Sequence, residues 1–290
     1  TEQRDIYKYI HDQTLRLANL GHTPDEIAEE IAEPNWLSSK FHARGYYGTL
    51  KFNARAVYQR YFGFFDGNPV NIDPLAPAAL GSKLTEALGG PDRVMELAQQ
   101  AIEKDDLQWA ATLLSGLVFA NEGSAHAKRL LALVYRHQGF REESGIMRNI
   151  YLMGAKELEE GVTLLPAAGG RNADLAATLS AKDWFDAYAL RLNPDKASDV
   201  SLVLNFNVDG QDLGVTVLRQ VEFARMDAAH PKPDAEITVS LPLLERLSSG
   251  ELTLKDAQAE GALINGSADA LSQWLALHDT FDLWFDIVAP

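Results

Sequence analysis

The spacing of apolar residues changes once along this chain, and this change decides its architecture. In the first half, apolar residues recur every three to four positions, as in Ile6, Ile10 and Leu17, which is the period of an amphipathic helix. Beyond residue 200 they alternate instead, as in Leu202 and Leu204, which is the period of a strand with one buried face. The sequence therefore predicts a multi-domain protein, all-helical first and then α+β.

The segment between the two patterns is rich in glycine and proline. It covers residues 157–171 and shows little periodicity, as expected of a connection between domains. We expect a helical domain over residues 1–156, a linker over residues 157–171 and an α+β domain over residues 172–290.

The helical domain contains a clear helix start and a weak internal repeat. Thr23 and Glu26 form a capping-box pattern, and Pro24 suits the first helical position. Residues 104–111 resemble residues 137–144, about 33 positions later, a spacing typical of tetratricopeptide-like helical hairpins. Two such hairpins cannot bury their own outer faces, so we expect a homodimer through this domain.

The second domain carries capping and hairpin signals of its own. Ser180 and Asp183 predict a capped helix start, and Asp209-Gly210 predicts a tight turn between two alternating strands. Two more alternating segments follow before a last helix that begins near Ser267. A mostly antiparallel sheet covered by helices is therefore predicted.

Four large apolar residues of this domain are candidates for binding an alkyl chain. They lie on the predicted inner faces of strands and helices, and they are Leu204, Phe206, Trp184 and Trp274. Two interpretations stay open, because periodicity does not separate them. The residues belong either to an ordinary packed core or to an elongated apolar cavity. The apolar end of the chain, residues 281–287, is expected to dock on one of the domains.

Composition excludes several classes of partner. The net charge is −15, so phosphate backbones and anionic lipid heads are repelled, and no nucleic acid is expected as a partner. No apolar run approaches the roughly 18 residues of a membrane span. Cysteine is absent, which excludes disulfides and thiolate chemistry. We expect a soluble protein, in a bacterial cytoplasm or periplasm that the sequence does not distinguish, and a chain that was cut from something longer.

No catalytic or metal-binding motif is present in the sequence. The seven histidines are not spaced as metal ligands. Nucleophile-elbow, phosphate-loop and dinucleotide-binding patterns are also absent. The sequence therefore predicts no catalytic residue and no metal site in this chain.

The segment from Arg44 to Asn53 is the most site-like part of the sequence. It combines a guanidinium, the phenols of Tyr46 and Tyr47, two glycines and an amide. Such donors in a glycine-containing loop suit a sulfate, phosphate or carboxylate group. The other interpretation is an aromatic loop packed between helices, with Arg44 stacked on a tyrosine.

Several runs of residues resemble the region that follows the catalytic domain in bacterial alkyl sulfatases. These enzymes are zinc-dependent, are of the metallo-β-lactamase type and hydrolyse alkyl sulfate esters. The resemblance runs from end to end and is carried by residues 7–12, 21–24, 44–48, 53–61, 65–69, 118–120 and 279–282. It implies that residues 1–155 are the family's dimerisation domain. It also implies that residues 172–290 are its C-terminal domain, which is similar to sterol carrier proteins.

The resemblance further implies where the zinc lies. In the family, an N-terminal domain binds zinc through an H-x-H-x-D-H motif, which this chain lacks. We therefore expect no cofactor in this chain, zinc in the parent enzyme, and no hydrolysis by this chain alone.

The loop around residue 44 is implied to complete the family's sulfate pocket. The residues that would face the sulfate are Arg44, Tyr46, Tyr47 and Asn53. The family pattern has a His-Asn pair and a later tyrosine, whereas this chain has Phe52-Asn53 and Phe64. Phenyl rings thus replace two polar contacts, which indicates a different or bulkier ester.

Two functions from different classes follow. The first is the dimerisation and alkyl-chain-binding portion of an alkyl sulfatase. The alternative is a free-standing dimeric protein that binds fatty or alkyl ligands, and a helical-repeat scaffold for another protein is a third. A metal-binding motif encoded upstream in frame would distinguish the first two.

Overall fold

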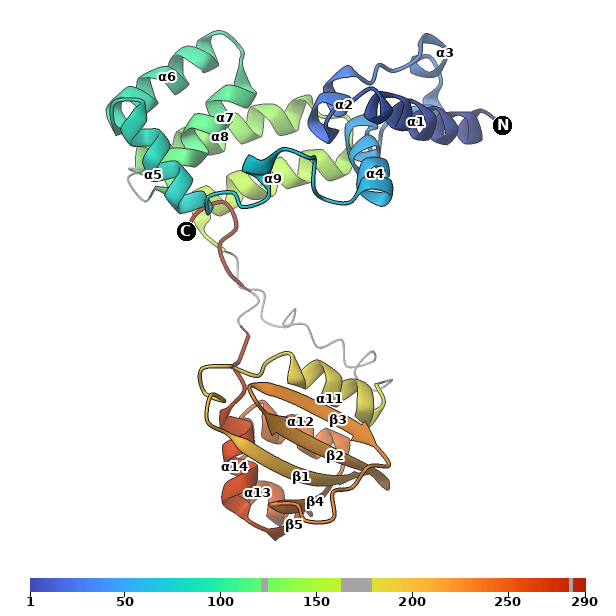
Figure 1. Ribbon diagram of the computed structural model, residues 1–290. Helices are drawn as coiled ribbons and strands as arrows, with labels where there is room; N and C mark the ends of the chain where they lie inside the picture. Colours follow the sequence, from blue (N-terminus) through green and yellow to red (C-terminus); the bar gives the residue numbers. More distant parts are fainter. Residues whose placement is uncertain (121–124, 163–178, 282–283) are drawn as a thin grey trace. The chain divides into compact units, whose positions relative to one another are not determined.

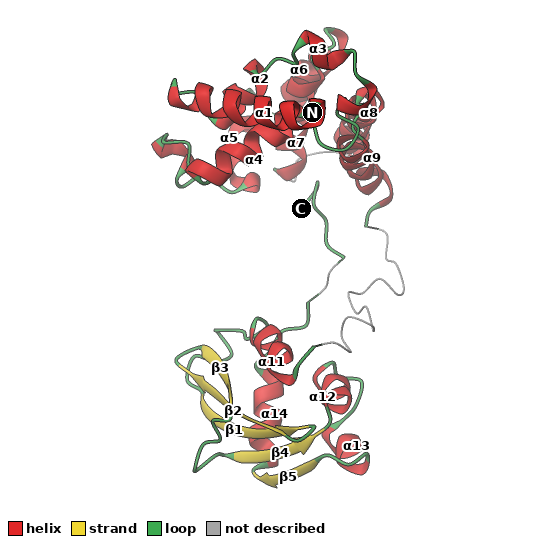
Figure 2. Cartoon of the chain, turned by 90° about the vertical axis from the view of Figure 1, so that its right-hand side faces the viewer, coloured by secondary structure: helices red, strands yellow, loops and turns green. Residues whose placement is uncertain are grey.

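The computed structural model describes residues 1–120, 125–162, 179–281 and 284–290, and it divides into two compact units (Figures 1 and 2). The first unit contains Thr1–Leu164 and Trp284–Pro290, and the second contains Leu165–Leu283. The order predicted from the sequence, a helical part and then an α+β part, is confirmed. Most of the expected linker lies outside the described residues, and its first four residues belong to a helix.

The helical unit begins with a small cluster of helices. They are α1 (Glu2–Asn19), α2 (Pro24–Glu30), α3 (Asn35–Ser38), the 3-10 helix η1 (Phe41–Ala43) and α4 (Leu50–Phe62). Leu17 of α1 and Ile27 of α2 pack with Tyr58 of α4 in one apolar cluster. The capping box predicted at Thr23 is confirmed, since its backbone N–H donates to Glu26 Oε2 at 2.8 Å.

An exposed segment connects this cluster to the rest of the unit. We call residues 63–76 the connecting arm; it contains the 3-10 helix η2 (Pro69–Asn71). Every residue of the arm except Asp66 is exposed. Its large apolar side chains are Phe64, Phe65, Val70, Ile72 and Leu75.

The remaining helices of this unit form two hairpins and a helix packed against them. They are α5 (Pro77–Ala87), α6 (Pro91–Glu103), α7 (Leu107–Phe119), α8 (Ala125–Arg141) and α9 (Gly145–Glu160). Helix α7 is the central one, and its Leu113, Leu114 and Leu117 are fully buried.

The predicted repeat spacing fits the first helices of the two hairpins but not the second helices. Helix α6 begins at Pro91 and α8 at Ala125, 34 positions later. Helix α7 begins at Leu107 and helix α9 at Gly145, which is 38 positions later rather than about 33. The reason is that α8 has 17 residues whereas α6 has 13. The second hairpin is therefore about one helical turn longer than the first.

The second unit is a five-stranded sheet with helices on one face (Figure 1). The strands run in the order β3-β2-β1-β4-β5, and only the β1–β4 pairing is parallel among the described strands. Their bounds are β1 (Ser201–Val208), β2 (Gln211–Leu218), β3 (Val221–Met226), β4 (Ala235–Val239) and β5 (Leu263–Gly266). The turn between β1 and β2 has positive φ at Asp209 (51°) and Gly210 (85°), as a two-residue hairpin requires.

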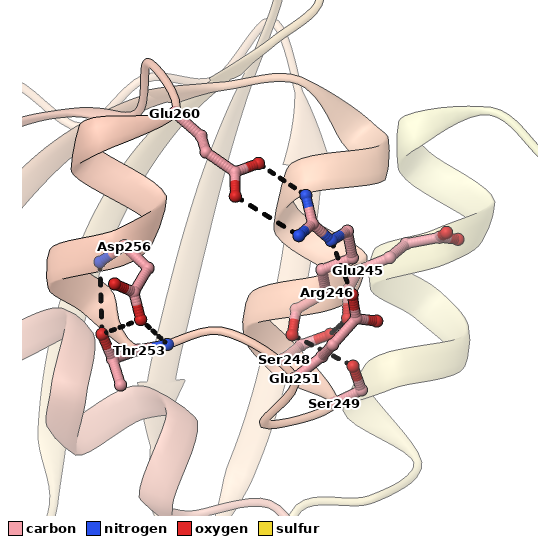
Figure 3. Close-up of polar contacts among 8 residues, drawn as sticks. All are labelled: Glu245, Arg246, Ser248, Ser249, Glu251, Thr253, Asp256 and Glu260. Carbon is pink, nitrogen blue, oxygen red and sulfur yellow. Dashed lines mark hydrogen bonds and ion pairs between the residues drawn. The ribbon is translucent and has the colours of Figure 1, made fainter.

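The described part of the second unit contains four helices besides the sheet. They are α11 (Ala181–Ala189), α12 (Leu241–Ser248), α13 (Leu254–Ala259) and α14 (Ala268–Ala276). Figure 3 shows how α12 and α13 are joined at the surface, where Arg246 donates to Glu251 at 2.8 Å and to Glu260 at 2.5 Å. Thr253 and Asp256 in the same view form the capping box that starts α13.

The apolar end of the chain docks on one of the two units. Residues 284–290 belong to the helical unit rather than to the α+β unit. They dock on α9, where Glu157 Oε1 accepts hydrogen bonds from the backbone N–H groups of Ile287 and Val288 at 2.6 and 2.7 Å.

Candidate functional site

The loop of residues 44–48 is fixed to the start of α9. Ser144 is the N-cap of that helix and accepts from the backbone N–H of Met147, while its hydroxyl donates to the Tyr47 carbonyl oxygen at 2.7 Å. The backbone N–H of Gly145 donates to the Tyr46 carbonyl oxygen at 2.8 Å. The position of the loop therefore depends on a helix about a hundred residues away in sequence.

Two glycines allow the loop to turn tightly against α4. A Cβ on Gly45 would lie 2.9 Å from the Gly48 carbonyl oxygen. A Cβ on Gly48 would lie 3.0 Å from Oδ1 of Asn53, so the Asn53 amide packs directly on this glycine. Thr49 caps α4 by accepting from the Phe52 backbone N–H at 3.1 Å. The tight turn of the loop and the capped start of α4 thus keep Asn53 next to residues 44–48.

A hollow of about 770 Å³ lies at this place. Its walls come from α1, the 44–48 loop, the start of α4 and residues 142–144. Arg44, Tyr47 and Asn53 are among the lining residues. Tyr46 is not among them, because its ring lies against Phe41 at 5.1 Å and beneath the Arg44 guanidinium at 5.5 Å. Three of the four predicted sulfate-side residues are therefore brought together.

The charge around the hollow is mainly negative. Arg44 forms an ion pair with Glu143, and Glu33 and Glu142 also line the space. His42 contributes a ring nitrogen, but it contacts Glu2 at 2.7 Å. The guanidinium thus both stacks on a tyrosine and pairs with a carboxylate, so an anion entering the hollow has to replace Glu143.

Sequence reasoning missed the residues that α1 and α9 contribute. Ile6 and Tyr7 line the hollow from α1, and Glu143 and Ser144 line it from the start of α9. A serine just before an apolar helical run is a recognisable N-cap signal. Nothing in the sequence indicates that this cap meets a loop 97 positions earlier.

The two phenylalanines that replace polar residues of the family pattern are both exposed. Phe52 lies in the first turn of α4 with 38% of its surface exposed, and Phe64 lies in the connecting arm with 80% exposed. Neither is among the residues that line the hollow.

The four candidate alkyl-binding residues share one packed core in the second unit. Leu204, Phe206 and Trp274 are almost completely buried, and Trp184 is 8% exposed. The Phe206 and Trp274 ring centroids are 5.2 Å apart. Trp184 stacks on Tyr188 at 4.8 Å, and Tyr188 contacts Trp274 at 5.0 Å.

A polar cluster is buried in the same core. Glu222 Oε2 accepts from Trp274 Nε1 at 2.9 Å and lies 3.0 Å from His278 Nε2. Among the residues that the structure describes, Glu222 Oε1 has no hydrogen-bond partner. His278 Nδ1 lies 2.8 Å from the Trp274 carbonyl oxygen and must donate to it. The remaining ring nitrogen then shares one proton with the Glu222 carboxyl group.

Burial is the main cause that raises the pKa of Tyr188 to about 12, and the nearby Glu222 carboxyl group is the second.

A smaller hollow of about 460 Å³ runs along the edge strand β3 of this unit. Its apolar walls include Leu190 and Phe223, which are exposed.

Comparison with known proteins identifies the family. Residues 23–161 match the family model described as alkyl sulfatase dimerisation, and residues 170–290 match the one described as alkyl sulfatase C-terminal. The chain belongs to the alkyl sulfatase family. This confirms the resemblance drawn from the sequence motifs.

Individual relatives agree with this assignment. The alkyl sulfatase chain is 36% identical over 293 residues to an (R)-specific secondary-alkylsulfatase from Pseudomonas sp., covering 100% of this chain and 44% of that protein. It is 37% identical to an alkyl/aryl-sulfatase of Saccharomyces cerevisiae, covering 100% of this chain and 45% of that protein. The solved structure of the inverting sec-alkylsulfatase Pisa1 from Pseudomonas sp. is similar with a TM-score of 0.93 and 36% identity, covering 99% of this chain and 46% of that one. The chain thus spans less than half the length of each of these three relatives.

The described part of this alkyl sulfatase chain contains neither a group of metal ligands nor a membrane-spanning helix. Across residues 1–120, 125–162, 179–281 and 284–290, no three His, Asp or Glu side chains are grouped so that they could hold a metal ion. These residues therefore do not fit a zinc site. None of the helices in the same ranges has the length and apolar character needed to cross a membrane.

Proposed function

We propose that this chain is the dimerisation and alkyl-chain-binding portion of an alkyl sulfatase that hydrolyses alkyl sulfate esters. Zinc and its ligands belong, in this proposal, to a part of the enzyme outside this chain. The chain's own residues pair two copies, complete the sulfate side of the pocket and hold the alkyl chain. The hollow beside residues 44–48 carries the proposal, since it gathers Arg44, Tyr47 and Asn53.

The alternative is a free-standing dimeric protein that binds fatty or alkyl ligands. This alternative requires the dimer and the apolar binding site, but it requires no residues that bind a sulfate group. Binding of sulfate at the hollow therefore separates the two functions.

Arg44 is the group that would recognise the sulfate. Its planar guanidinium matches two oxygens of a sulfate group, and the Asn53 amide can donate to a third. The Arg44–Glu143 pair is about half exposed on both sides, and such pairs are typically worth at most about 1 kcal/mol. A sulfate ester can therefore displace Glu143 at low cost, especially where a neighbouring domain excludes water.

A sulfate titration of the full chain, followed through the side-chain amide NMR signal of Asn53, tests this role. Glu143→Gln frees Arg44 and should tighten sulfate binding by about fivefold, since it removes a competing interaction of about 1 kcal/mol. Arg44→Gln should abolish the shift. Glu142→Gln is the matched control, because it removes a lining carboxylate that has no ion pair with Arg44. An Asn53 signal that ignores sulfate in Glu143→Gln would refute the sulfate side and leave the alternative.

The connecting arm is the surface that a second copy would cover. It lies within the matched dimerisation region, and Val70, Ile72 and Leu75 each expose half or more of their surface. Burying such side chains removes apolar area from water at roughly 25 cal/mol per Å². In a two-fold dimer the same patch on both copies is buried at once.

Light scattering of the full chain tests this assembly. The native chain should show twice its 31.9 kDa mass, and Ile72→Asp should shift the mass toward that of the monomer. Leu263→Asp is the control, because it places the same charge on an equally exposed apolar residue of the second unit. A native monomer, or a dimer indifferent to Ile72→Asp, contradicts the proposed surface.

A further inference from the structure

The last seven residues bind the helical unit as a separate peptide would. Between them and the rest of this unit, the chain forms the complete second unit, residues 165–283. The contacts of the tail with α9 join residues about 130 positions apart. The tail therefore reaches its place through its own contacts rather than through a short connection.

Glu157 provides the polar part of these contacts. One of its carboxylate oxygens accepts from two consecutive backbone N–H groups, Ile287 at 2.6 Å and Val288 at 2.7 Å. Hydrogen bonds to an ionised acceptor are roughly twice as strong as neutral ones. Glu157 binds backbone N–H groups rather than side chains, so proline at position 287 or 288 would remove a donor.

Apolar packing sets which side chains fit. A Cβ on Gly154 would lie 3.4 Å from Cγ1 of Val288, an ordinary van der Waals distance, so Val288 packs directly on this position of α9. Ala289 is 8% exposed and belongs to the same core cluster as Ala155 and Leu158. A larger or charged side chain at position 288 or 289 would meet this packed surface.

We propose that α8 and α9 carry a peptide-binding site whose ligand is the C-terminal tail of the chain itself. The site takes an extended peptide with two consecutive free N–H groups facing Glu157, followed by small apolar side chains. The stability of the helical unit then depends on the last seven residues of the chain. This role is independent of sulfate or alkyl binding.

Hydrogen exchange in the full chain tests the site directly. The amides of Ile287 and Val288 should exchange at least about 100-fold more slowly than those of an unstructured peptide. Glu157→Gln keeps an acceptor but removes its charge, so it should speed their exchange about tenfold. Glu160→Gln is the matched control, because it removes a carboxylate of the same helix that pairs with Lys156 instead. Unprotected amides in the native chain, or amides indifferent to Glu157→Gln, would overturn the proposal.

A second measurement supplies the tail in trans. A chain that ends at Leu283 should bind a synthetic peptide of residues 284–290 saturably, and the same peptide with Val288→Asp should fail to bind. A shortened chain that keeps its helical circular dichroism yet ignores the native peptide contradicts the site. If the shortened chain does not fold, the exchange rates in the full chain decide.

Discussion

The hydroxyl of Ser144 donates to the carbonyl oxygen of Tyr47 at 2.7 Å, across 97 positions of sequence. The same oxygen atom of Ser144 caps α9 by accepting from the Met147 backbone N–H at 3.3 Å. One side chain thus fixes both the start of a helix and the loop that carries Arg44. The geometry of the candidate sulfate side depends on this helix cap.

Ser144→Ala should therefore lower the free energy of unfolding by more than the loss of an ordinary helix cap does. We expect a loss of about 2 kcal/mol in the free energy of unfolding, since a cap contributes about 1 kcal/mol and a second buried hydrogen bond about as much. Urea denaturation followed by circular dichroism measures it. Ser180→Ala removes a cap in the second unit without touching the loop, and should cost about 1 kcal/mol. Equal losses in the two variants would show that the loop contact contributes nothing.

The crossing of α5 and α7 depends on a glycine. A Cβ on Gly81 would lie 2.3 Å from the Gly116 carbonyl oxygen, so Gly81→Ala forces the helices apart. We expect a loss of roughly 2 kcal/mol, as overpacking of a core commonly costs. Gly116→Ala is the control, because its Cβ would meet Leu84 Cδ2 at 3.5 Å and Gly81 Cα at 3.9 Å, both ordinary contact distances. Thermal unfolding that ranks Gly116→Ala as the worse variant would contradict this crossing.

The buried Glu222 depends on His278 for a shared proton. His278→Ala leaves the carboxyl group with Trp274 as its one donor within the described ranges, and breaking a buried pair in this way typically costs about 3 kcal/mol or more. His230→Ala removes an exposed imidazole of the same unit, which accepts from the Lys232 backbone N–H at 3.1 Å, and should cost about 1 kcal/mol or less. Denaturant midpoints of the two variants make the comparison. A small loss for His278→Ala would mean that the pair is dispensable.

Deprotonation of Tyr188 should lower the free energy of unfolding at high pH. Its folded pKa is raised from 10.0 to about 12, so the folded state keeps a proton that the unfolded chain releases near pH 10. The stability it contributes is therefore complete below pH 10 and falls as the pH rises toward 12. Tyr188→Phe should flatten this part of the stability curve, as measured by urea unfolding across the range. A curve of unchanged slope in Tyr188→Phe would assign the loss to other groups.

Local signals in the sequence were sufficient for most elements of the fold. The capping boxes at Thr23 and Ser180 and the turn at Asp209-Gly210 each depend on residues a few positions apart, and all three are confirmed. The change from helical to alternating periodicity likewise placed the sheet.

Relationships between distant residues could not be predicted in the same way. The pairing of Arg44 with Glu143 and the docking of Val288 on α9 bring together residues about a hundred or more positions apart. Single-sequence periodicity does not report such contacts. The repeat spacing holds for the starts of α6 and α8 but not for those of α7 and α9, since the extra turn of α8 has no signal in the short motif that suggested the repeat.

The claim that this chain holds an alkyl chain is tested most directly by one titration of the full chain. Octanoic, decanoic and dodecanoic acids are added below their micelle concentrations while the tryptophan fluorescence of the chain, to which Trp184 and Trp274 contribute, is followed. Each added methylene should contribute about 0.8 kcal/mol, so affinity should rise about fourfold per methylene until the site is full. Absent binding, or binding that does not strengthen with chain length, would contradict the account and leave the second unit with a solid core.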